Sequence, residues 1–259
     1  MFAVYDGCHR SILLSTLLLL ASCLALLAFT PAPSPQAQDM DDMPGMQDAP
    51  AVAHETVAML AKRAADKRES EFNHRFAGLL LVLAGILVLA HVSFAKASRV
   101  VRYAWPFCFF AAGLFLLVFS DTEIWPFGPQ SPWFAVTHNP EDLQHKLFAL
   151  ILLLLGFVEL QRVLGKLKAS WSAWVFPLVG LAGAVMLLFH THSAGMHGPN
   201  HMAVMRHIQA EHRWYAAVGV GIVTAKVISD ARNRWKDVFA KVWPLLLMVL
   251  GVSLMLYTE

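Results

Sequence analysis

The chain has 259 residues, of which 57% are hydrophobic and only 15% charged, and its formal net charge is +2. Because a soluble domain carries about 25% charged residues, this composition indicates an integral membrane protein, and the lack of a basic tract argues against nucleic-acid binding. The three cysteines form no CxxC pair, so neither a disulfide scaffold nor a thiolate metal site is expected.

Residues 1–37 are interpreted as a signal peptide or an uncleaved anchor. Arg10 precedes a long apolar run, and the Pro-, Gln- and Ala-rich sequence PAPSPQAQ follows it. Small residues near Ala37 would suit signal peptidase, whereas the LASC sequence ending at Cys23 also resembles a lipoprotein cleavage box. In each case the chain from about residue 38 onward is expected outside the cytoplasmic membrane.

Residues 38–71 are predicted to form an exported Met/Asp-rich tail followed by a surface helix. Met40, Met43 and Met46 alternate with aspartates in a segment that cannot build a core. Thioethers prefer Cu(I) and carboxylates accept Cu(II), so the tail could collect copper; a plain acidic linker is the alternative. Helix-forming residues then lead to the membrane.

Residues 72–259 are predicted to form the membrane domain, an all-α polytopic helical bundle. The apolar segments are each near the roughly 20 residues that cross a bilayer. Six of them are placed at about 73–95, 103–120, 143–162, 171–190, 211–229 and 243–257.

The connecting loops predict the orientation of these helices. Three loops are basic, whereas the loops 121–142 and 191–210 contain only Arg206 as a basic residue. The basic side chains are Lys96, Arg99, Arg102, Arg162, Lys166, Lys168, Arg232, Arg234, Lys236 and Lys241. By the positive-inside rule the basic loops face the cytoplasm, which agrees with an exported tail.

With this orientation, histidines from four helices reach one depth near the outer leaflet. Half of the 12 histidines lie between residues 187 and 214. Ionisable groups beside membrane spans are costly and usually face the bundle interior with a partner. We therefore predict a metal centre; its candidate ligands are His74, His145, His190, His192 and His212. His192 could join His190 only if the helix unwinds between them.

Further residues are predicted as accessory ligands. Glu123 follows the second segment, and the loop before the fifth segment is rich in His and Met. Its candidates for metal capture are Met196, His197, His201, Met202, Met205 and His207. Histidines that merely anchor helix ends at the interface, and methionines that pack on the membrane surface, are the alternative interpretation.

Short motifs distributed over the membrane region resemble a known family. HRFAG opens the first segment, SDTEIWPFGP follows the second, LQHKLFALILLLLGFVE forms the third, and FHTHSAG precedes HIQAEHRW. Together these are similar to the copper resistance protein D type of bacterial membrane protein. The resemblance covers about residues 72–259, and it implies copper handling at the inner membrane, with His74, His145, His190 and His212 in the metal role. Better-known members have about eight spans, and they often work with a small copper-binding domain.

The favoured hypothesis is an integral inner-membrane copper-binding protein that serves copper uptake, delivery or resistance. Its tail and His-rich loop would face the periplasm or the exterior, and its partners would be the lipid bilayer and a periplasmic copper-carrying protein. The alternative is a b-type cytochrome that holds haem b between histidines of two helices. No HExxH motif and no recognisable catalytic triad is present, so we expect no enzymatic activity.

Overall fold

The computed structural model describes residues 57–94, 99–189, 201–231 and 234–258. Within these ranges the chain is helical and contains no β-strand, which confirms the all-α prediction. The elements are α2 (Val57–Ser93), α3 (Arg99–Phe119), α4 (Pro132–His138), α5 (Pro140–Val163), the 3-10 helix η2 (Ser170–Trp174), α6 (Val175–Leu188), α7 (His201–Asp230) and α8 (Lys236–Met255). The predicted signal segment 1–37 and the tail methionines Met40, Met43 and Met46 lie outside the described residues.

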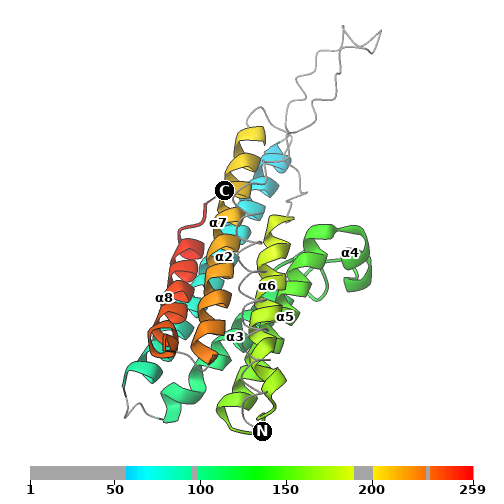
Figure 1. Ribbon diagram of the computed structural model, residues 1–259. Helices are drawn as coiled ribbons and strands as arrows, with labels where there is room; N and C mark the ends of the chain where they lie inside the picture. The colour runs from blue at the N-terminus through cyan, green and yellow to red at the C-terminus, as the bar shows by residue number, and fades with distance from the viewer. Residues whose placement is uncertain (1–56, 95–98, 190–200, 232–233, 259) are drawn as a thin grey trace.

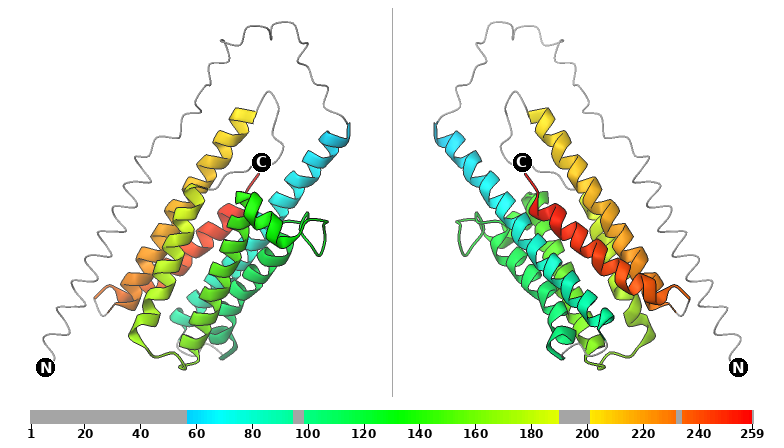
Figure 2. Two further views of the ribbon diagram at one scale, coloured as in Figure 1. Left: turned by 90° about the vertical axis from the view of Figure 1, so that its right-hand side faces the viewer. Right: turned by 90° about the vertical axis from the view of Figure 1, so that its left-hand side faces the viewer.

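The long helices form a closed ring in which each contacts two neighbours. The order around the ring is α2, α3, α5, α6, α7 and α8, and α8 returns to α2. Figure 1 shows these helices running side by side along one axis, with the short α4 projecting beside the start of α5. In Figure 2 the first turns of α2 and α7 extend beyond the other helices at the same end. We call this the His74 end, and the opposite one the Asp230 end.

Five helices in the described part of the chain are long and apolar enough to cross a membrane. These are α2, α3, α5, α6 together with η2, and α8, so the predicted membrane helices are confirmed there. The fifth predicted segment, which lies in α7, is as long but more polar, because it carries Arg213 at its start and Lys226 within its apolar part. It is also rich in buried residues, from Ile208 to Val227. Side chains of α7 thus face protein more than lipid, where polar groups can find partners.

An aromatic cluster fills the bundle interior towards the Asp230 end. Trp105 of α3 packs edge-on against Trp243 of α8, with ring centroids 5.9 Å apart, and Phe176 of α6 contacts Trp243 at 5.7 Å. Phe109 joins the same cluster from α3. Edge-to-face contacts of this kind add about 0.5–1.5 kcal/mol each beyond the apolar area they bury. The cluster fixes three helices of the ring against one another.

Helices α2 and α8 approach closely along a seam of small residues. Gly78 lies opposite Gly251, and a Cβ atom added to Gly78 would meet the Gly251 carbonyl oxygen at 2.4 Å. One heptad further along α2, a Cβ atom on Gly85 would meet the Pro244 carbonyl oxygen at 2.7 Å. Small residues that let two backbones approach are a recurrent device of membrane helix packing. The seam brings the end of α8 against the beginning of the α2 membrane span.

Two segments expected to be loops contain helix. Residues 201–210 were expected to belong to a flexible loop, yet α7 begins at His201; the sequence AVMRHIQAE is rich in strong helix formers, which explains the extension. Similarly, α4 lies inside the predicted loop 121–142, where Ser131 caps its first turn and accepts a hydrogen bond from the Phe134 amide. The surface helix and the first membrane segment form one continuous helix, α2.

Candidate functional site

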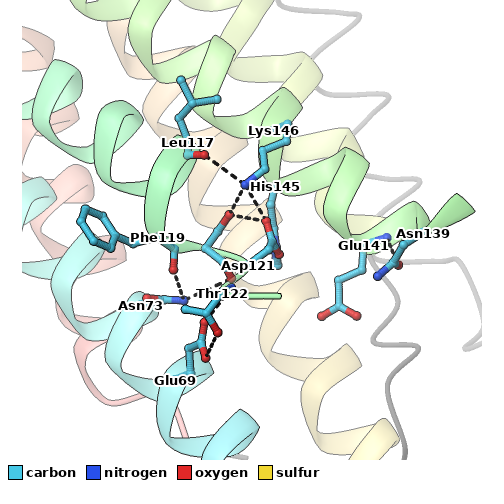
Figure 3. A network of polar contacts seen from close by, with 11 residues as sticks. Glu69, Asn73, Leu117, Phe119, Asp121, Thr122, Asn139, Glu141, His145 and Lys146 are labelled. Carbon is cyan, nitrogen blue, oxygen red and sulfur yellow. Dashed lines mark hydrogen bonds and ion pairs between the residues drawn. The ribbon is translucent and has the colours of Figure 1, made fainter. Parts of the chain in front are cut away.

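His145 belongs to a buried polar network at the His74 end. Its Nδ1 atom lies 2.7 Å from an Asp121 carboxylate oxygen, and the other carboxylate oxygen lies 2.8 Å from the Lys146 ammonium (Figure 3). Lys146 also donates to the Leu117 carbonyl and the Ser120 hydroxyl. An ionised carboxylate only accepts, so His145 donates through Nδ1, and the neutral ring then carries its lone pair on Nε2. This carboxylate–histidine arrangement is the one that orients metal-ligating histidines.

The electrostatics of Asp121 follow from these partners. Burial alone would raise the pKa of its carboxyl group, whose side chain is only 8% exposed. The hydrogen bond and the charge of His145, with the hydrogen bonds from Lys146 and Ser120, outweigh burial and hold the pKa well below its ordinary value. Asp121 therefore carries a permanent negative charge at the His74 end of the bundle. It keeps His145 in one orientation.

Side chains of α2 form hydrogen bonds with the segment around Asp121, residues 119–122. Glu69 accepts hydrogen bonds from the Thr122 amide at 3.2 Å and from the Thr122 hydroxyl at 2.8 Å. The Asn73 amide donates to the carbonyls of Phe119 and Ser120 at 3.4 Å (Figure 3). These contacts tie the Asp121 segment to α2 immediately beside His74.

His74 belongs to an aromatic cluster between α2, α7 and the chain that follows α8. Its ring stacks on the Tyr257 ring with centroids 3.9 Å apart, and the His212 ring lies 6.5 Å from it. The ring of Tyr215 contacts His212 edge-on at 6.0 Å. His212 and Tyr257 are almost fully buried, at 3% and 0% exposure. Two predicted ligands from different helices are thus brought together inside the protein.

The separation of the two rings fits a shared ion. A metal–nitrogen bond of about 2.0–2.1 Å, with roughly 1.2 Å more to each ring centre, places two imidazoles on one ion at most about 6.5 Å apart. The observed 6.5 Å equals this upper limit, so a shared ion would require one nitrogen of each ring to face the other ring. The Nδ1 atom of His74 donates to the Ser70 carbonyl at 2.8 Å, which places the proton of the neutral ring on Nδ1 and fixes its tautomer.

The other predicted ligands have different surroundings. Glu123 is exposed, and its carboxylate pairs with Lys62 at 2.8 Å, so Asp121 and not Glu123 is the acidic side chain that reaches His145. His207 is exposed on α7 and lies 3.5 Å from Glu211, while Met205 is half-buried. His201 and Met202 lie in the first turn of α7. His190, His192, Met196 and His197 lie outside the described residues.

Sequence reasoning missed Tyr257 and Asp121 as named site residues. Asp121 had a signal, since it ends the second span among polar residues, but Glu123 is equally acidic two positions later. Tyr257 had none, because it reaches His74 only through the α2–α8 contact.

The predicted site residues that the structure describes form two separate pairs. His145 lies with Asp121, and His74 lies with His212; no group of three or more His, Cys, Asp or Glu side chains suited to one metal ion occurs within the ranges described. Comparisons with protein-family models, curated proteins and solved structures find no match to the chain, so the likeness to the copper resistance D type remains a prediction from its motifs.

Proposed function

We propose that the protein binds copper at the His74 end of the bundle and serves copper uptake, delivery or resistance. The observation that carries the proposal is the pair formed by half-buried His74 and buried His212, whose ring separation of 6.5 Å is within reach of two imidazoles on one ion. Imidazole serves copper in both oxidation states. His190 and His192, which follow α6 in the sequence, are proposed additional ligands, and so is His145, which Asp121 orients.

The proposal places the protein in a bacterial inner membrane with the His74 end towards the periplasm. The basic residues of the loops support this orientation, because they gather at the Asp230 end. In this arrangement residues 1–37 act as the export signal or anchor, the Met-rich tail and the Met205–His207 region capture the ion, and a periplasmic copper-carrying protein supplies it. The proposed role is binding and delivery, without a catalytic step.

Metal analysis of the purified full chain tests the proposal. We expect about one copper ion per chain, held mainly by imidazole nitrogen. The variant His74→Ala/His212→Ala should lose that copper while its helix content persists. The matched control is His91→Ala/His138→Ala, which removes the same number of rings: His91 lies in the last turn of α2 and His138 is exposed on α4. Equal copper content in both double variants would refute the proposal.

The same purified sample distinguishes bound haem from bound copper. Two axial histidines on a haem iron would have a similar separation of their ring centres. A porphyrin, however, needs a wide slot between the two imidazole rings, and here Tyr257 already stacks on His74. A Soret absorption band that disappears in His74→Ala/His212→Ala would favour the cytochrome over copper handling. A protein that holds copper and shows no Soret band favours the proposal.

A further inference from the structure

An apolar groove opens between α5 and α6 on the outer face of the bundle. Its volume is about 590 Å³, and exposed Leu154, Phe157 and Leu178 line it, with Trp171 near one end. Helices α5 and α6 pack less extensively than any other neighbouring pair in the ring, which leaves the groove accessible from the side. A groove on the lipid-facing surface of a membrane helix pair is shaped for a hydrocarbon chain.

A polar pocket lies beside this groove at the Asp230 end. The pocket has a volume of about 650 Å³ and shares Leu167 with the groove, so the two are contiguous. The pocket is lined by a network of ion pairs. Arg162 pairs with Glu159 at 2.7 Å and with Asp230 at 3.1 Å. Lys226 reaches the same Asp230 carboxylate at 2.6 Å. The acidic groups of the pocket are therefore already satisfied by basic groups from the bundle.

The rim of this combined site is positive. Lys166 lines the apolar groove and Lys168 lines the polar pocket, and both belong to the exposed loop between α5 and η2. Neither ammonium pairs with an acidic side chain in the part of the chain that the structure describes. The loop is held in place by the buried Ser172 hydroxyl, which donates to the Ala169 carbonyl at 2.7 Å. Two unneutralised lysines thus stand where an apolar groove meets a polar pocket.

We propose that this site binds an anionic phospholipid. The acyl chain lies in the groove along Leu154 and Phe157, the phosphate contacts Lys166 and Lys168, and the headgroup enters the pocket. Basic pockets between membrane helices are known to bind anionic headgroups, and Trp171 stands at the level where aromatic rings meet them. The apolar groove selects a lipid over a soluble anion. The inference depends neither on copper nor on which face of the membrane is cytoplasmic.

Native mass spectrometry of the full chain in detergent tests this proposal. The protein is titrated separately with phosphatidylglycerol and phosphatidylcholine, and we expect tighter binding of one phosphatidylglycerol. Each lysine near an anionic lipid is worth roughly a fivefold change in affinity, so Lys166→Gln/Lys168→Gln should weaken that binding by about twenty- to thirtyfold. The matched control is Lys236→Gln/Lys241→Gln, which removes two exposed charges from α8 at the same end of the bundle.

The control variant should bind phosphatidylglycerol as the original chain does. Equal affinity for the two lipids, or an equal loss in both double variants, would overturn the proposal, because it would show adsorption or a diffuse charge effect. Displacement of the lipid by millimolar inorganic phosphate would overturn it as well, since the site would then recognise a free anion.

Discussion

The seam between α2 and α8 gives a sharp test of how the candidate site is built. In Gly78→Ala the new Cβ atom would lie 2.4 Å from the Gly251 carbonyl oxygen, whereas ordinary contacts begin at 3.4 Å. The helices must therefore separate by roughly an ångström, and overpacking of this kind costs about 1–3 kcal/mol of unfolding free energy. His74 lies one turn before Gly78, and Tyr257 follows Gly251 at the end of α8, so their stacked rings should separate too.

The matched control is Gly183→Ala in α6. There a Cβ atom would meet the nearest side-chain atom, in Phe148, at an ordinary 3.6 Å. The same substitution then only gains helix propensity, up to about 1 kcal/mol. Gly78 also lies inside a helix and gains the same propensity, so the two variants should differ by the overpacking cost, about 1–3 kcal/mol in unfolding free energy, with Gly78→Ala the less stable.

Thermal unfolding in detergent, followed by circular dichroism, measures this difference, and copper titration measures its effect on the site. Gly78→Ala should melt lower than Gly183→Ala and should bind copper more weakly. If the two variants melt together, the close approach of α2 and α8 does not stabilise the fold, and the account of how His74 meets Tyr257 is wrong.

Three further predictions concern buried charges. Asp121→Asn should lower copper affinity by about 10–100-fold if His145 is a ligand, since that is the usual effect of removing a carboxylate that orients a ligating histidine; an unchanged titration would remove His145 from the site. Because the pKa of Asp121 is held below its ordinary value, the stability it contributes is present above about pH 4 and is lost as pH falls further. Melting temperatures between pH 6 and pH 3 should therefore fall more steeply in the original chain than in Asp121→Asn. Lys226→Met should cost about 1–3 kcal/mol, and a double-mutant cycle with Asp230→Asn should show favourable coupling between the two side chains; additive effects would show that their contact contributes nothing.

Five of the six predicted membrane helices, and their order, could be predicted because apolar segments of bilayer length leave a strong signal. The helix ends could not, because α2 and α7 continue beyond the membrane through polar, helix-forming residues that carry no hydropathy signal. The sequence also predicted that His74, His145 and His212 lie near the same end of the bundle, because membrane topology alone places those residues at a common depth.

The pairing of these side chains depends on packing that the sequence does not reveal. Which of Asp121 and Glu123 meets His145 is decided by a tight turn in which the Ile124 amide donates to the Asp121 carbonyl at 3.1 Å. The surroundings of Lys226, a buried basic residue of α7, also depend on packing. Its spacing from Asp230 is that of a helical pair, but the aromatic rings beneath it, Trp243 at 5.5 Å and Phe176 at 5.8 Å, come from two other helices.

The polarity of α7 has a consequence for how the protein is made. An Arg or Lys raises the insertion free energy of a membrane helix, by about 2.5–3.5 kcal/mol at the centre and by less towards the ends, so Lys226, with Arg213 near the His74 end, makes α7 enter a bilayer less readily by itself than the other segments. Its contacts with α6 before it and α8 after it supply the missing stabilisation. Biogenesis should therefore hold α7 at the translocon until α8 has been synthesised, and a nascent chain that stops before residue 236 should leave α7 accessible to water.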